Sequence, residues 1–191
     1  SLFAPPSPRA VGISPAGAVV VGGQFPGTEG TAEFKGGSAG ATLDYDEENS
    51  FLVALSSDGT LKWTKIIRSR VRNAVSRVLV TEDSVFVLGT HQPGDVLGEG
   101  DSTELEVPVA AYTLSKYALL SGAFEWAVFF TDRTGSSATS AFEVWSSGDA
   151  LVVPSYFQEL RVIGPGWDRL FSPPSSSSAV LAGLTIGGDG Q

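Results

Sequence analysis

An internal repeat constrains this 191-residue chain more than any other feature of its sequence. Three segments run from one apolar stretch through a tight turn into another, and their turns recur about every 65 residues. The segments are Val11–Gly23, Ser76–Thr90 and Ala141–Ser155. Their apolar runs are short, rich in β-branched residues and bounded by Gly, Asp or Pro, which is typical of buried strands. Each segment therefore predicts a β-hairpin.

A second hairpin signal recurs between these segments. It spans Ser50–Trp63, Ala110–Trp126 and Ala179–Gln191, and each copy has a glycine-containing turn next to an apolar run. In the first two copies a tryptophan follows the turn glycine at the same offset. Asp-Gly between apolar runs favours a hairpin, because glycine adopts the positive φ of the primed turns. Two hairpins in each repeat predict four strands.

The predicted fold class is all-β, built from about three four-stranded antiparallel blades of a β-propeller with an incomplete ring. Residues 1–191 form one propeller segment with approximate blades 10–67, 74–131 and 138–191, the last of which lacks its outer strand. Helical periodicity is nearly absent, although Val71–Val80 tolerates a turn of helix. A β-sandwich is the alternative fold, and two equivalent hairpins per repeat favour the propeller.

A closed propeller needs roughly 4–8 blades, so three blades leave the ring open. Three explanations compete for how the ring is completed. The chain is a segment of a longer polypeptide, or other copies or a partner subunit complete the ring, or residues 1–4 close the last blade by strand addition. In each case a blade needs neighbours to cover its faces.

The first repeat also carries a series of short motifs. They are Gln24-Phe25, Phe34–Gly37, Phe51–Leu55, Asp58-Gly59 and Trp63. This series resembles the tandem repeats of seven-bladed β-propeller type found in many exported bacterial proteins and some eukaryotic ones. The second and third repeats match more loosely. The resemblance implies the propeller fold, and with the lack of cysteine it implies an exported, extracellular or organelle-lumen protein. Its signature residues form turns and core, so it says little about function.

A second, weaker resemblance concerns one part of the first repeat. The segment Leu52–Trp63 is similar to a repeat of quinoprotein-type propellers. In those propellers the motif packs blades together, so the similarity does not imply quinone binding.

Composition excludes several functions. The net charge of −9 argues against a nucleic-acid partner, because such a surface needs clustered positive charge. The absence of cysteine excludes a disulfide framework, a thiolate zinc site and a cysteine nucleophile. The sequence also has no apolar run long enough to predict a membrane span. With one histidine, His91, and no nucleophile-elbow motif, we predict no catalytic residues.

Two acidic runs fall on the same predicted face of the blades, Asp44–Asn49 and Glu99–Glu106. Asp44, Asp46 and Glu48 could gather around a hard cation such as Ca²⁺, which binds carboxylate oxygens. Calcium is the one cofactor that the sequence suggests, and solvated loop carboxylates are the simpler interpretation.

Two further groups are candidate binding residues. Arg68, Arg70 and Arg72 alternate, so an extended strand would place them on one side. Pairing with the acidic runs is their simplest use, and docking of an acidic partner or anion is the alternative. Trp167 lies in a segment, Gly164–Phe171, that we expect to be irregular, where an exposed ring could bind a sugar or a protein or pack on its own blade.

The sequence therefore predicts a non-catalytic scaffold or protein-binding propeller module within a longer chain or complex. Its expected partners are proteins or further blades that complete the ring. Two alternatives remain open at this stage. One is a propeller enzyme, either a carboxylate-based hydrolase or a quinoprotein-like protein, and the other is a sugar-binding lectin propeller.

Overall fold

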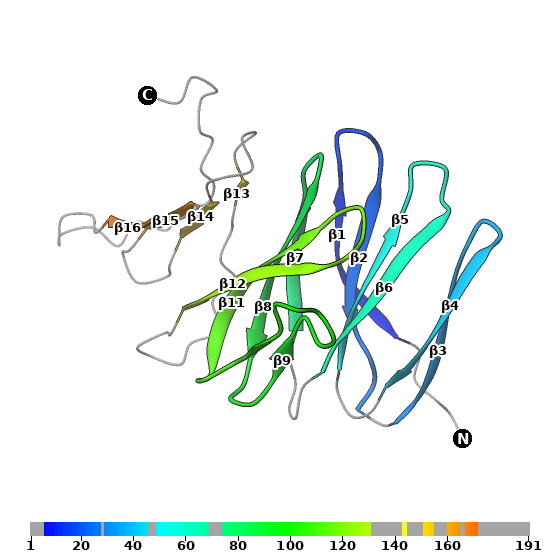
Figure 1. The fold of residues 1–191 in the computed structure, drawn as a ribbon, viewed down its shortest axis with the longest axis horizontal. Helices are drawn as coiled ribbons and strands as arrows, with labels where there is room; N and C mark the ends of the chain where they lie inside the picture. Colours follow the sequence, from blue (N-terminus) through cyan, green and yellow to red (C-terminus); the bar gives the residue numbers. More distant parts are fainter. Residues whose placement is uncertain are drawn as a thin grey trace. The chain divides into compact units, whose positions relative to one another are not determined.

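The computed structural model describes residues 6–27, 29–45, 49–68 and 74–130, and the backbone of residues 143–144, 151–154, 160–164 and 167–171. The chain divides into two compact units, Ser1–Thr134 and Gly135–Gln191. Every regular element in these described ranges is a β-strand (Figure 1), which confirms the all-β prediction. The same ranges hold no helix of the length and apolarity that a membrane crossing requires.

The first sheet is a four-stranded antiparallel meander. Its strands are β1 (Ser7–Ile13), β2 (Val19–Gln24), β5 (Ser50–Leu55) and β6 (Leu61–Ile67), paired in the order β1-β2-β5-β6. They come from the two hairpins that the first repeat predicts.

The second sheet has the same topology. Its strands are β7 (Ala74–Val80), β8 (Ser84–His91), β11 (Ala111–Ala118) and β12 (Phe124–Phe130), paired in the order β12-β11-β8-β7. Residues 74–80 form a strand, and not the helical turn that the sequence also allowed for this segment. Both sheets are blade-like units of the kind that the sequence predicts.

The repeat extends to the pairing register of the two sheets. In the first sheet one row of paired residues is Ile13, Val19, Leu55 and Leu61, and in the second sheet the matching row is Val80, Val85, Tyr117 and Phe124. Each sheet also has one register shift in its first hairpin and one in its second. Trp63 and Trp126, which share one offset in the sequence, each sit beside the second shift. The two sheets are thus equivalent residue by residue.

Each of these sheets carries an inserted hairpin between its second and third strands, which the sequence did not predict. The first insert pairs β3 (Gly30–Gly36) with β4 (Ala39–Tyr45), and the second pairs β9 (Val96–Leu97) with β10 (Leu105–Glu106). The first acidic run begins in β4 with Asp44, and the second, Glu99–Glu106, spans the loop between β9 and β10 and ends in β10.

The main core lies between the first and second sheets. Its buried members include Val20 and Leu52 of the first sheet and Val75, Val85 and Val87 of the second. Buried residues of the second insert, Leu97 and Val107, belong to the same cluster. The sheets pack face to face, as blades do.

Two glycines let the sheets approach closely. A Cβ on Gly22 would lie 2.6 Å from Cγ1 of Val75, and a Cβ on Gly12 would lie 2.7 Å from Cγ2 of Val80. Strand β7 therefore packs closely on β1 and β2. A residue larger than glycine at position 12 or 22 would collide with valine side chains of β7.

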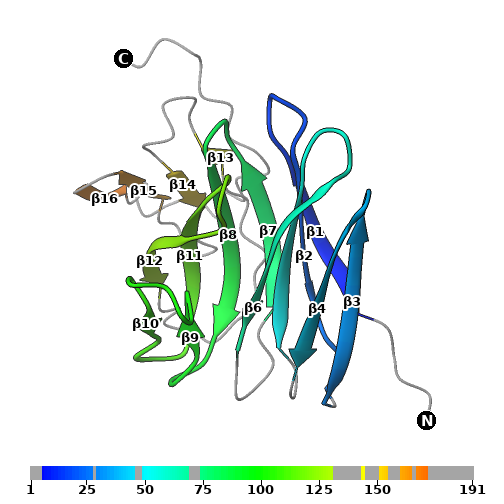
Figure 2. The same cartoon turned by 45° about the vertical axis from the view of Figure 1, so that its right-hand side comes forward.

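A second core cluster lies on the opposite side of the first sheet. Here β3 and β4 cover the sheet over β5 and β6, so that the first sheet lies between this insert and the second sheet (Figure 2). Phe25 stacks on Tyr45 with ring centroids 4.2 Å apart and contacts Phe51. Aromatic packing thus fixes the insert on its own sheet.

The second unit contains a third sheet. Its strands β13 (Glu143–Val144), β14 (Leu151–Pro154), β15 (Leu160–Gly164) and β16 (Trp167–Phe171) are antiparallel and paired in chain order. The prediction of an irregular segment around Trp167 is wrong, because Trp167 begins β16 and pairs with Gly164. The predicted hairpin Ala179–Gln191 lies outside the described residues.

We predict that Gly22→Ala lowers the free energy of unfolding by about 1–3 kcal/mol, because the new methyl group overpacks the contact with Val75. Gly40→Ala is the matched control, since a Cβ there meets no atom closer than 3.5 Å. Urea unfolding measures both variants. Equal stability of the two variants would contradict the close approach of the sheets.

The β5–β6 turn allows a second prediction. The Asp58 carboxylate accepts hydrogen bonds from Ser56 Oγ at 2.5 Å and from Thr60 N at 2.9 Å, and these bonds lower the pKa of Asp58 to about 2. In Ser56→Ala the pKa of Asp58 should rise toward 3.8, as measured by NMR titration. The Asp83 carboxyl in another turn is the internal control, and an unchanged Asp58 pKa would disprove this turn geometry.

Candidate functional site

The first sheet has one face that is covered over only part of its width by the described residues. Over β5 and β6 the first insert buries Val53 and Leu61, whereas on β1 Val11 is 61% exposed and Ile13 is 64% exposed. Val11 pairs with Val21 and Ile13 with Val19, so all four side chains share this face. We call Val11, Ile13, Val19 and Val21 the open face. Within it Val11 and Ile13 are exposed, whereas Val19 and Val21 are half-buried and Val21 packs against the cluster under the first insert. Exposed apolar side chains that lie side by side are candidates for an interaction surface.

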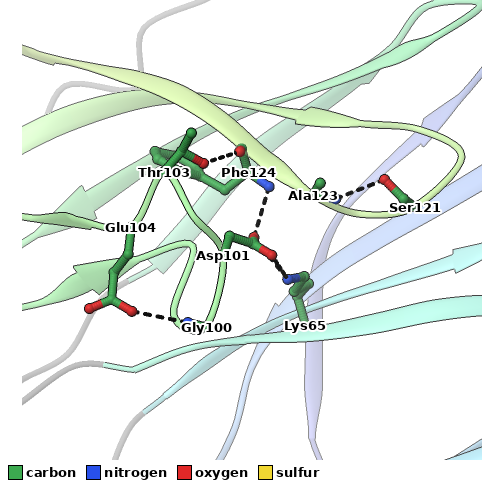
Figure 3. A network of polar contacts seen from close by, with 8 residues as sticks. All are labelled: Lys65, Gly100, Asp101, Thr103, Glu104, Ser121, Ala123 and Phe124. Atoms are coloured by element: carbon green, nitrogen blue, oxygen red, sulfur yellow. Dashed lines mark hydrogen bonds and ion pairs between the residues drawn. The ribbon is translucent and has the colours of Figure 1, made fainter.

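A polar network joins the first and second sheets at the second insert (Figure 3). Lys65 Nζ on β6 lies 2.9 Å from both carboxylate oxygens of Asp101, and the backbone N–H of Phe124 on β12 donates to Oδ2 of Asp101 at 2.8 Å. One carboxylate thus links strands of two sheets. Because both charged side chains are about four-fifths buried, solvent screens this pair less than a surface pair.

The surroundings of the Asp101 carboxyl act on its pKa in opposite directions. Burial raises the pKa, while the hydrogen bond from Phe124 N and the neighbouring Lys65 ammonium lower it. The lowering effects prevail, so the pKa of Asp101 lies below its ordinary 3.8. The carboxylate is therefore charged at neutral pH and serves as the acceptor of the network.

Other contacts hold the loop between β9 and β10 in place. Thr103 Oγ1 donates to the carbonyl oxygen of Phe124, and the backbone N–H of Gly100 donates to Oε2 of Glu104 at 3.0 Å (Figure 3). Arg68 Nε lies 2.7 Å from Oε2 of Glu99. The acidic run Glu99–Glu106 thus supplies carboxylates that fix the insert against the first sheet.

The three predicted basic binding residues, Arg68, Arg70 and Arg72, have different outcomes. Arg68 makes the intramolecular ion pair that the sequence offered as the simplest use of this run. Arg70 and Arg72 lie outside the described residues, so docking of an acidic partner by them stays a prediction. Of Trp167 only the backbone in β16 is described, and its binding role also stays a prediction.

The predicted calcium ligands are described only in part. Asp44 lies on β4, where its Oδ1 accepts a hydrogen bond from Thr31 Oγ1 at 3.0 Å. Asp46 and Glu48 lie outside the described residues. Within the described ranges no group of three or more His, Asp or Glu side chains comes together as a metal site. Calcium binding therefore stays a prediction.

His91, the sole histidine of the sequence, ends strand β8 and is buried. Its Nδ1 lies 3.6 Å from Oδ2 of Asp95, which also accepts a hydrogen bond from the backbone N–H of Gln92 at 2.9 Å. Both side chains are almost fully buried. His91 and Asp95 thus lie buried side by side in the connection between β8 and the second insert, and no hydrogen bond joins His91 Nδ1 to a described residue.

No protein-family model matches the chain, and no curated protein is significantly similar to it. The assignment of function therefore depends on the geometry above.

The Lys65–Asp101 pair gives a third prediction. A double-mutant cycle of Lys65→Met and Asp101→Asn should show a coupling of about 1 kcal/mol at neutral pH. Since the pKa of Asp101 is lowered on folding, this contribution is present above pH 3.8 and is lost as the pH falls through the lower, folded pKa.

Urea unfolding at several pH values measures this coupling. The exposed pair Lys35–Glu33, with N–O distance 3.1 Å, is the matched control and should show almost no coupling. A coupling for Lys65–Asp101 that equals the control would mean that the ion pair does not hold the sheets together.

Proposed function

We propose that this chain is a non-catalytic module of propeller type that scaffolds or binds other protein segments. The open face is the observation that carries the proposal, because the sheet places apolar side chains in solvent next to a well-packed core. A stable sheet normally buries such side chains against another layer. A protein surface is the natural occupant of a flat apolar sheet face.

The repeat architecture supports the same proposal. The register of the first sheet recurs in the second, so these two sheets are similar units, and each uses the other for burial. By its resemblance to the seven-bladed repeats, the chain is part of a propeller of that type. An exported or lumenal location is proposed on the same resemblance.

The charged side chains near the inter-sheet network support a structural role. Lys65 of β6 and Arg68 directly after it pair with Asp101 and Glu99 of the second insert, and these ion pairs hold the sheets and the insert together. Among the described residues we find no observation that favours the enzyme or the lectin over the scaffold.

Self-association tests the proposed function. If the open face binds protein surfaces, the average mass of the chain in light scattering should rise with concentration above 19.9 kDa. The double variant Val11→Glu, Ile13→Glu should stay at that mass, because two carboxylates cannot be buried without partners.

Leu120→Glu is the matched control, since Leu120 is an apolar residue of the β11–β12 turn that is 87% exposed and lies off the open face. This variant should associate like the parent chain. If the parent stays monomeric at every concentration, or if all three proteins behave alike, the open face is not a binding surface and the proposal fails.

A further inference from the structure

Polar side chains lie on the face of the second sheet that packs against the first sheet. Thr113, Ser115 and Tyr117 alternate along β11, so their side chains share one face of the sheet. Ser115 pairs with Val87 and Tyr117 with Val85, and both valines belong to the main core. The three polar side chains are therefore built into the apolar contact between the two sheets, where all three are fully buried.

His91 lies on the same face at one end of this group. Strand β8 pairs with β11 without a register shift, so His91 shares a face with Val85 and Val87. It is buried beside the Asp95 carboxylate. We call Thr113, Ser115, Tyr117 and His91 the polar strip.

The polar strip holds polar atoms that have no partner. Within the described residues, the buried side-chain polar atoms without a hydrogen bond are Thr113 Oγ1, Tyr117 Oη and His91 Nδ1, and all of them belong to the strip. Ser115 Oγ lies 3.4 Å from the carbonyl oxygen of Val87, which is at the limit of a hydrogen bond. Unpaired buried polar atoms are costly and rare in folded proteins. Their concentration on one sheet face therefore requires an explanation.

The Tyr117 phenol is neutral in this environment. Burial raises its pKa to about 12, the neighbouring Ser115 hydroxyl acts in the opposite direction, and the Asp101 carboxylate raises the pKa further. The phenol hydroxyl therefore keeps its proton at physiological pH. It is able both to donate and to accept a hydrogen bond.

The equivalent strand of the first sheet has apolar residues at the same positions. The matching registers align the β11 residues of the polar strip with Phe51, Val53 and Leu55 of β5. These three residues pack in the apolar cluster under the first insert. A sheet of this kind thus folds without polar residues here, and the polar strip distinguishes the second sheet from the first.

Side-chain volume also differs at one of these positions. Phe51 pairs with Gly23, and a Cβ on Gly23 would lie 2.7 Å from Cε1 of Phe51, so the ring lies over the glycine. The equivalent pair in the second sheet is Gly89 and Thr113, which has no ring. The sequence therefore supplies less side-chain volume beside the unpaired Thr113 Oγ1, as a site for a small molecule requires.

We infer that the polar strip binds internal water molecules, which pair with the side chains of Thr113, Tyr117 and His91 inside the interface between the two sheets. Water suits these groups because hydroxyl and imidazole side chains both donate and accept hydrogen bonds. A buried water molecule typically pairs with about three polar groups that would otherwise have no partner. The strip supplies such groups within one apolar interface.

A metal cation suits the strip less well than water. The carboxylates beside the strip already have other partners, since Asp101 pairs with Lys65 and Asp95 accepts a hydrogen bond from the backbone N–H of Gln92. The groups that remain are neutral. A neutral ligand that both donates and accepts is therefore the better match.

Removal of single hydroxyls tests whether they are paired. Thr113→Val and Tyr117→Phe each delete a hydroxyl and keep a similar shape. If water pairs with these hydroxyls, both variants should lower the urea midpoint, because a hydrogen bond is lost. If the hydroxyls are unpaired, both variants should raise it, because removal of an unpaired buried polar group is stabilising. Thr42→Val is the matched control, since Thr42 is exposed on β4, and it should leave the midpoint nearly unchanged.

Oxygen-17 relaxation dispersion of the solvent gives the direct readout. It detects water molecules that stay inside the protein for longer than the protein takes to tumble, and side-chain hydroxyl groups do not contribute to it. At equal protein concentration, the double variant Thr113→Val, Tyr117→Phe should lose the dispersion amplitude of about one water molecule or more relative to the parent chain. Thr42→Val should keep the parent amplitude. An unchanged amplitude in the double variant overturns the inference, and so does a higher urea midpoint in both single variants.

Discussion

The close approach of β7 to the glycine-lined face of β1 and β2 is the contact on which the rest of the structure depends. Gly12 and Gly22 leave space that Val75, Val78 and Val80 fill, so the two sheets meet face to face over a shared apolar core. Neither sheet alone could bury its apolar side chains. The second insert and the Lys65–Asp101 pair extend the same interface to β6 and β12.

This contact also explains why the first sheet has two unlike faces. One face has glycines that contact the valines of β7. The other face has valines and isoleucine, and the described residues leave Val11 and Ile13 of β1 exposed on it. The second sheet has Leu79 and Leu88 at the positions that match Gly12 and Gly22, so the glycine-lined face is a feature of the first sheet and not of the repeat.

The sequence predicted those features that depend on local pattern. Short β-branched runs around Gly17 and Asp83 and the Asp58-Gly59 turn indicated the hairpins, and the shared offset of Trp63 and Trp126 indicated the repeat. The inserts were missed because Phe34 and Tyr45 pack through contacts distant in sequence, and β9 has only two residues. The open face was missed for the same reason, since Val11 and Val78 read alike in sequence and differ only in what lies against them.

Methyl NOE spectroscopy of the unmodified chain tests the inter-sheet contact most directly. The account predicts cross-peaks from the Val75 methyl groups to the α-protons of Gly22 and from the Val80 methyl groups to those of Gly12, with Val11 and Ile13 methyl groups showing no contact to the second sheet. Absence of the glycine cross-peaks, or contacts from Val11 and Ile13 to β7 and β8 in their place, would contradict the face-to-face packing of equivalent sheets.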